Sequence, residues 1–174
     1  MCLLEPIIEK LTASAKLEHF AEKMRLKVKT LTEEHMRPKS IYDDFLKGVN
    51  FRRALGRLAF RLSKGETNIY MLSLLSEADQ RGRNGNEDRP KTREEMGSIL
   101  DWQEWINNKA KTEKLYEKLP DKLLDGKTVV NQLGMKPGVV VGVLVEWVFQ
   151  DQIEGDVTTV GEALQRGKEY LSVI

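Results

Sequence analysis

Apolar residues recur every three or four positions along most of the chain, which is the period of one face of an α-helix. Segments with this period are residues 3–13, 17–36, 51–64 and 67–80. Pro38 is expected to stop the second of these helices, because proline lacks a backbone N–H and restricts the residue before it. A short helical segment over residues 41–46 follows it and closes at Gly48. The pattern therefore predicts an all-α fold.

The composition changes at residues 81–91, which read RGRNGNEDRPK and contain no apolar residue. Such a stretch is typical of a loop or linker. We therefore divide the chain into a helical subdomain over residues 1–82, a linker over 83–91 and a second helical subdomain over 92–174. Thr92 and Glu95 have the spacing of a capping box, and the helix they begin is expected to run to about Leu119, before Pro120.

The end of the chain predicts a compact unit of three helices, over residues 127–133, 137–153 and 159–172. Val139–Val145 is rich in β-branched residues, and its propensity alone favours a buried strand. We interpret it as a helix because Pro137 suits a first helical turn and no partner strand is visible. Gly138 and Gly142 lie four residues apart, so we expect them to leave one helix face bare for close packing.

Composition limits the classes of function. The chain has 174 residues, a net charge of +1 and 32% charged residues, so nucleic-acid contacts would have to come from local patches. A single cysteine, Cys2, excludes an internal disulfide. The longest strongly apolar run, about Val139 to Phe149, is too short to span a bilayer, and the first residues lack a signal peptide's pattern. We expect a cytoplasmic protein without membrane contact.

The strongest local concentration of charge lies in residues 51–64, which hold five cations and no acid. Four of them follow helical spacing at i, i+4, i+8 and i+11: Arg53, Arg57, Arg61 and Lys64. They form one stripe, which can track a phosphate backbone or can simply be a solvated helix face. Arg81 and Arg83 begin a second, weaker cluster. Lysines between Lys109 and Lys127 form a third, partly compensated by acids, and Trp102 and Trp105 fit a core better than a base-stacking platform.

One further pattern covers the C-terminal third. It comprises Asp125-Gly126, then Leu133-Gly134-Met135-Lys136-Pro137-Gly138 and Gly142, and continues through Gly155-Asp156, Thr159 and Glu162-Ala163-Leu164. The pattern resembles the C-terminal region of bacterial tRNA nucleotidyltransferases (CCA-adding enzymes) and related poly(A) polymerases.

The resemblance extends upstream with conserved order. His35-Met36-Arg37-Pro38, the helix RRALGRLAFRL over residues 52–62 and the segment 68–83 are similar to segments of the same family. The likeness implies an all-α body and tail that bind tRNA and present its 3′ end to a catalytic head. It adds the turn at Lys136 and Gly138 to the candidate RNA-binding residues Arg53, Arg57, Arg61, Lys64, Arg81 and Arg83.

The catalytic parts of that family are missing here. The head of the family carries an Asp-x-Asp pair that holds Mg²⁺ and uses CTP and ATP, and this chain has no such pair. We therefore expect neither catalytic nor metal-binding residues, nor any cofactor, in this chain. A separate head subunit is one expected partner, alongside tRNA or another structured RNA, and DNA is not expected.

Two alternatives stay open. Some members of the family carry an HD phosphohydrolase domain, and the resemblance places Asp79 at its last aspartate. His19 and His35 are the only histidines and neither precedes an aspartate, so the other ligands are absent. The second alternative is a helical assembly module that joins a separate head or a second copy of itself.

Overall fold

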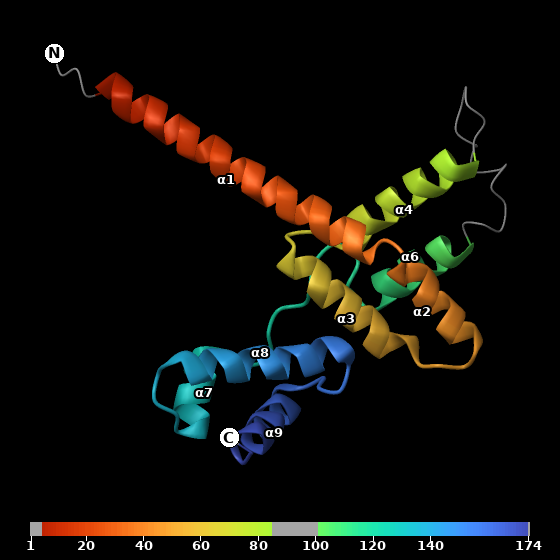
Figure 1. Ribbon diagram of the computed structural model, residues 1–174. Coiled ribbons are helices and arrows are strands. Elements are labelled where there is room, and N and C mark those ends of the chain that lie inside the picture. Colours follow the sequence, from red (N-terminus) through yellow and green to blue (C-terminus); the bar gives the residue numbers. More distant parts are fainter. Residues whose placement is uncertain (1–4, 85–100, 174) are drawn as a thin grey trace.

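The computed structural model describes the backbone of residues 5–84 and 101–173, and the side chains of 15–80, 82 and 101–173. Within these ranges the secondary structure is helical throughout, without strands (Figure 1), which confirms the all-α prediction. The helices are α1 (Glu5–Glu34), α2 (Arg37–Leu46), α3 (Phe51–Lys64), α4 (Ile69–Asn84), α6 (Asp101–Thr112), α7 (Gly126–Leu133), α8 (Val139–Glu154) and α9 (Val160–Leu171).

Several helix boundaries match the sequence pattern, and others differ from it. Helix α3 has the predicted bounds, and the Asn50 side chain caps it by accepting a hydrogen bond from the Arg52 amide at 2.9 Å. The two predicted N-terminal helices form one helix, α1. Pro38 was expected to stop the helix before it. It also lies in the first turn of the next helix, α2, where a missing N–H costs nothing.

The helix predicted from residue 92 ends at Thr112, well before Pro120. Its predicted capping box, Thr92 with Glu95, lies outside the described residues. Val139–Val145 belongs to α8, which confirms the helix interpretation over strand propensity; Val141, Leu144 and Val145 are buried there.

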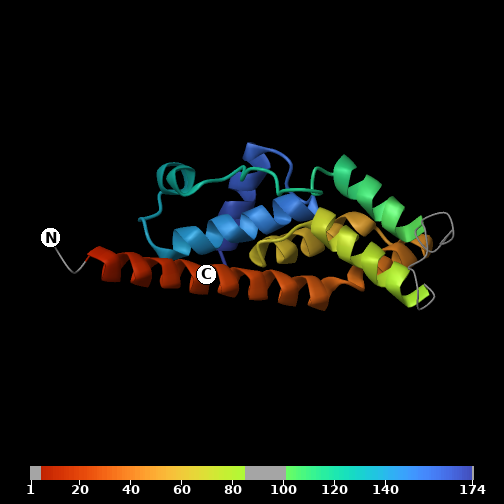
Figure 2. The ribbon, with the colours of Figure 1, turned by 90° about the horizontal axis from the view of Figure 1, so that it is seen from above.

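The first hydrophobic core is built around α3. Leu55, Leu58 and Leu62 are fully buried there, in contact with apolar residues of α2, α4, α6 and the C-terminal half of α8. Figure 2 shows α3 lying among these helices. Because α8 contributes Phe149 and Ile153 to this core, it ties the C-terminal part of the chain to the first core.

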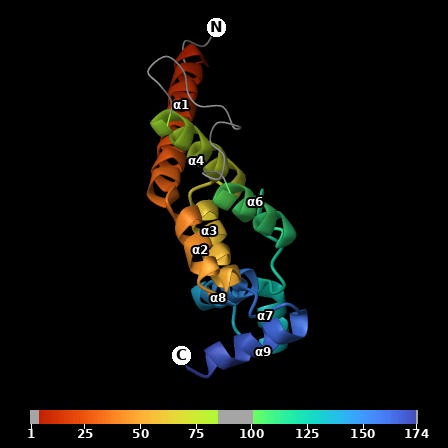
Figure 3. The same ribbon diagram turned by 90° about the vertical axis from the view of Figure 1, so that its right-hand side faces the viewer.

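The second core joins α7, α8 and α9. Its fully buried members include Val129, Leu144 and Ala163, and in Figure 3 these helices lie below the α2–α3 pair. Ile106 and Ala110 of α6 belong to the first core, so α6 packs with helices from the preceding part of the chain. The division into subdomains around residues 83–91 stays a prediction, since residues 85–100 lie outside the described residues.

The expected packing role of Gly142 is wrong. A Cβ atom at Gly142 or at Gly138 would meet no neighbouring atom within 4 Å, so this face of α8 is open. The close approach is made by Gly56 of α3, where a Cβ would lie 2.6 Å from the carbonyl oxygen of Ile153. Glycine at position 56 lets α3 and the end of α8 cross with their backbones in contact.

The projecting half of α1 has little to pack against. Beyond its contacts with α3 and α4, the helix extends away from the other helices. Its apolar side chains at Leu17, Phe20 and Met24 are exposed, although their spacing is that of a packed helix face.

Candidate nucleic-acid interface

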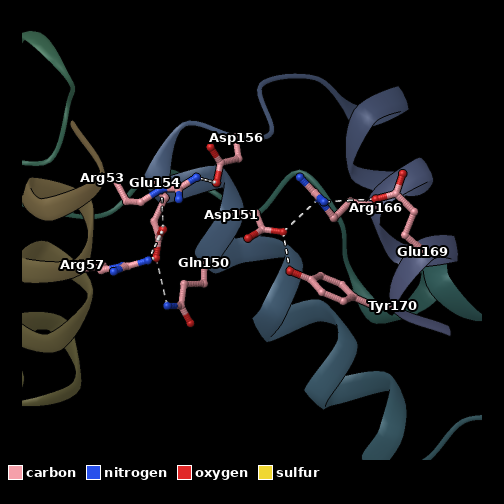
Figure 4. Close-up of polar contacts among 9 residues, drawn as sticks. All are labelled: Arg53, Arg57, Gln150, Asp151, Glu154, Asp156, Arg166, Glu169 and Tyr170. Atoms are coloured by element: carbon pink, nitrogen blue, oxygen red, sulfur yellow. Dashed lines mark hydrogen bonds and ion pairs between the residues drawn. The ribbon is translucent and has the colours of Figure 1, made fainter. Parts of the chain in front are cut away.

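The basic stripe on α3 is neutralised by acids from distant parts of the chain. Arg53 and Arg57 point toward the C-terminal end of α8, where Glu154 and Asp156 receive them (Figure 4). Nη2 of Arg53 lies 2.6 Å from Oδ2 of Asp156, and its Nε lies 3.3 Å from Oε2 of Glu154. Arg57 binds both carboxylate oxygens of Glu154, at 2.9 and 3.1 Å.

Glu154 is the centre of this cluster. Its side chain is only 6% exposed, so its carboxylate has lost most of its water and depends on these partners. Gln150 donates a further hydrogen bond to Oε1 at 3.1 Å. The hydrogen bond to Asp156 raises the pKa of Arg53 above its ordinary value, and the hydrogen bond to Glu154 does the same for the pKa of Arg57.

The other half of the stripe is paired in the same way. Arg61 binds Glu34 of α1 through two nitrogens, at 2.7 and 3.1 Å. Lys64 pairs with Glu146 of α8, which also accepts from Lys122 at 3.0 Å. These hydrogen bonds, first of all the one from Lys64, lower the pKa of Glu146.

All four stripe cations therefore face carboxylates. The acids that compensate the stripe lie far from it in the chain, because only the local sequence is free of acids, and the role of the stripe in RNA binding stays a prediction. The stripe joins α3 to α1 and α8, and a phosphate backbone would have to compete with ion pairs already formed.

Arg81 and Arg83 lie within α4, and their side chains are outside the described residues. The structure therefore neither groups them with the stripe nor separates them from it, and their role in RNA binding stays a prediction.

Lys136 and Gly138 lie on the turn between α7 and α8. Gly134 ends α7 with φ +68°, a left-handed conformation that suits glycine. Gly138 precedes α8 and offers no side chain to its first amides. The first amides of a helix have no partner one turn earlier; here the Val141 amide donates to the Gly138 carbonyl oxygen at 3.2 Å, which leaves the Val139 and Val140 amides as the candidate donors. Lys136 is exposed, and in the described part of the chain its ammonium group makes no salt bridge.

This turn borders an open groove of about 350 Å³. Residues of α7, of the turn and of the start of α8 line it, including Lys127, Asn131 and Pro137. Lys127 and Asn131 were not among the site residues predicted from the sequence. The sequence did contain a signal for Lys127, which belongs to the third lysine cluster and lies two residues after Asp125, the N-cap of α7.

The groove combines the features that bind phosphate in proteins. The first turn of a helix carries partial positive charge and exposed N–H donors, and Lys127, which lines the groove, supplies a full charge beside it. The arrangement can hold a phosphate of a nucleic-acid backbone, whose contacts position a ligand without reading its sequence.

Two other properties bear on function. Among the described residues, no three His, Cys, Asp or Glu side chains converge in a way that would hold a metal ion. His35 lies directly after α1, with Nδ1 2.6 Å from the Thr32 carbonyl oxygen. No helix in the described ranges is long and apolar enough to cross a membrane.

The chain was compared with protein-family models, with curated proteins and with solved structures, and none of them matches it.

Proposed function

We propose that this chain is an RNA-binding helical region of the tRNA nucleotidyltransferase and poly(A) polymerase type. It holds a tRNA or another structured RNA by its phosphate backbone, so that a catalytic head outside this chain acts on the 3′ end. CTP, ATP and Mg²⁺ would be used by that head. The collinear sequence resemblance supports this proposal.

One structural observation carries the proposal. The uncapped start of α8 opens onto a groove beside Lys127, and the exposed Lys136 lies on the same turn. In contrast to the α3 stripe, neither lysine is engaged in a salt bridge in the described part of the chain. We therefore assign the RNA contact to the α7–α8 turn and not to the stripe.

The test is the salt dependence of tRNA binding. We expect the double variant Lys127→Gln, Lys136→Gln to reduce the log–log salt slope by about one to two units, since each phosphate contact contributes roughly 0.9. Lys168→Gln serves as a matched control, because Lys168 is an exposed lysine of α9 that does not line the groove. A double variant with the slope of the control would refute the assignment.

The exposed face of α1 favours a second candidate, an assembly module that docks onto a separate head or a second copy. Leu17 is 69% and Phe20 63% exposed on this helix, and exposed apolar stripes often mark interaction sites. Light scattering distinguishes the candidates. A monomer at tens of micromolar that still binds tRNA favours the RNA-binding role, and a dimer abolished by Leu17→Glu, Phe20→Glu favours assembly.

A further inference from the structure

A second cleft lies between the start of α4 and the segment that follows α6. Its volume is about 550 Å³. The lining residues are two tyrosines, three lysines and one glutamate: Tyr70, Tyr116, Lys111, Lys114, Lys118 and Glu117. Aromatic rings and cations on one open surface are the combination that binds single-stranded nucleic acid.

The tyrosines form a fixed platform. Their ring centroids lie 5.6 Å apart at an angle of 60°, and Tyr70 is 44% exposed. The backbone holds them together, because the Tyr70 amide donates to the Tyr116 carbonyl oxygen at 3.1 Å. The Asn68 side chain also donates to the Glu117 carbonyl oxygen at 2.9 Å. These hydrogen bonds hold the two backbone segments together, so both rings start from fixed positions at the cleft.

The lysines of the cleft differ from those of the α3 stripe. Nζ of Lys111 lies 4.8 Å from the centroid of the Tyr116 ring. In the described part of the chain, no carboxylate lies within salt-bridge distance of Lys111, Lys114 or Lys118. Three cations against one glutamate leave the cleft with an excess of positive charge.

Lys114 occupies a backbone conformation that lysine rarely adopts. Its φ is +57°, at the point where α6 ends and the Leu115 amide donates to the Ala110 carbonyl oxygen at 2.8 Å. Glycine is the usual residue at such a helix end. Residues in strained backbone conformations cluster at functional sites. Lys114 keeps such a conformation inside a charged cleft, from which we infer that its side chain has a role there.

We propose that this cleft binds one unpaired nucleotide of an RNA strand, with its base stacked on Tyr70 and its phosphate held by Lys114 and Lys118. The proposal deepens the RNA-binding role and rests on it. Bases within a duplex are already stacked and paired, so the platform would select a loop, a bulge or a single-stranded end. An acidic peptide would use the lysines but would leave the tyrosine faces unused.

The experiment measures binding of a fluorescein-labelled single strand, rA6, by anisotropy. We expect Tyr70→Leu to weaken binding on the order of 5- to 10-fold, from loss of the stacking surface, and Tyr70→Phe to leave it unchanged. Lys118→Gln should weaken it less, and Lys168→Gln not at all. Equal affinities for the Tyr70→Leu variant and the parent protein would overturn the proposal.

Lys114→Gly separates binding from folding. Glycine relieves the backbone strain, so the urea midpoint should stay the same or rise while affinity for rA6 falls. If binding survives Lys114→Gly and Lys118→Gln together, the lysines do not hold the phosphate and the proposal fails.

Two further ligands identify the source of the nucleotide. AMP should bind at least 10-fold more weakly than rA6 and show the same loss with Tyr70→Leu. AMP binding as tight as rA6 would instead assign a free mononucleotide and overturn the RNA assignment. A blunt RNA duplex should be insensitive to Tyr70→Leu. If the cleft proposal fails, the assignment of the α7–α8 turn still stands, because the tRNA salt slope of the Lys127→Gln, Lys136→Gln variant tests that turn separately.

Discussion

The crossing of α3 and α8 offers a sharp test, because the same glycine-to-alanine change has opposite effects at two positions. Gly56 and Gly142 both lie inside helices. At either position, alanine favours the helix by up to ~1 kcal/mol and restricts the unfolded chain to a similar extent. What differs is the space for the new methyl group.

The geometry sets the steric cost at Gly56. A Cβ there would lie 2.6 Å from the carbonyl oxygen of Ile153 and 3.2 Å from Cα of Glu154. Separations under 3.0 Å are essentially never seen for Cβ atoms, so α3 and α8 must move apart. The neighbours are backbone atoms and cannot rotate away. Overpacking of this kind costs ~1–3 kcal/mol.

We therefore expect Gly142→Ala to stabilise the protein by up to ~1 kcal/mol, because nothing lies within 4 Å of its Cβ. Gly56→Ala should be less stable than Gly142→Ala by ~1–3 kcal/mol. The propensity and unfolded-state contributions are common to both variants, so the difference isolates the steric cost.

The assay is urea unfolding followed by circular dichroism at 222 nm. With a typical slope of ~1–3 kcal/mol/M, the two midpoints should differ on the order of 1 M. Slopes should stay the same, since neither change alters the surface exposed on unfolding. Equal midpoints for the two variants would show that α3 and α8 do not cross in contact at Gly56, and the packing that aligns Arg57 with Glu154 would be refuted as well.

The remaining predictions concern polar contacts and activity. Arg57→Gln should lower the free energy of unfolding by ~1–3 kcal/mol, and with it the urea midpoint. The reason is that the buried Glu154 carboxylate loses the residue that binds both of its oxygens. An unchanged midpoint would mean that the stripe is only a solvated face. Burial, together with the hydrogen bond to Asp151 that Figure 4 shows, raises the pKa of Tyr170 to about 12. The unfolded chain loses this proton near the ordinary value of 10.0, so stability should fall between about pH 10 and 12. The Tyr170→Phe variant should lose less stability over the same pH range, and an identical loss would contradict the raised pKa of Tyr170. Thr159→Ala removes the capping box of α9, in which the Glu162 amide donates to Thr159 Oγ1 at 3.2 Å. It should cost ~1 kcal/mol in urea unfolding, with Thr159→Ser retaining most of the stability. The purified chain should add no CTP or ATP to tRNA in the presence of Mg²⁺, and addition by protein free of host enzyme would refute the absence of a catalytic pair.

The two candidate sites differ in whether local sequence or distant contacts form them. The turn before α8 could be predicted from the sequence because proline and glycine act on their own neighbours, whereas the RNA-binding role of Lys136 and Gly138 came from the family resemblance and stays a prediction. The cleft at Tyr70 could not be predicted, because its platform joins residues 46 positions apart in the chain, Tyr70 and Tyr116. Nothing in either local segment indicates that the two rings meet.

The sequence by itself determined several of the helices of this protein. Helical periodicity, the cap at Asn50 and the turn at Gly134 depend on residues a few positions apart, so the helices of residues 51–64, 127–133 and 159–172 follow from local physics. Tertiary structure alone decided what those helices contact. Arg57 looks unpaired in its own helix, yet Glu154, 97 positions away, neutralises it. Gly142 and Gly56 look equally suited to close packing, and only the crossing of α3 over α8 selects Gly56. Charge compensation and steric fit act through space, and a linear pattern does not contain those distances.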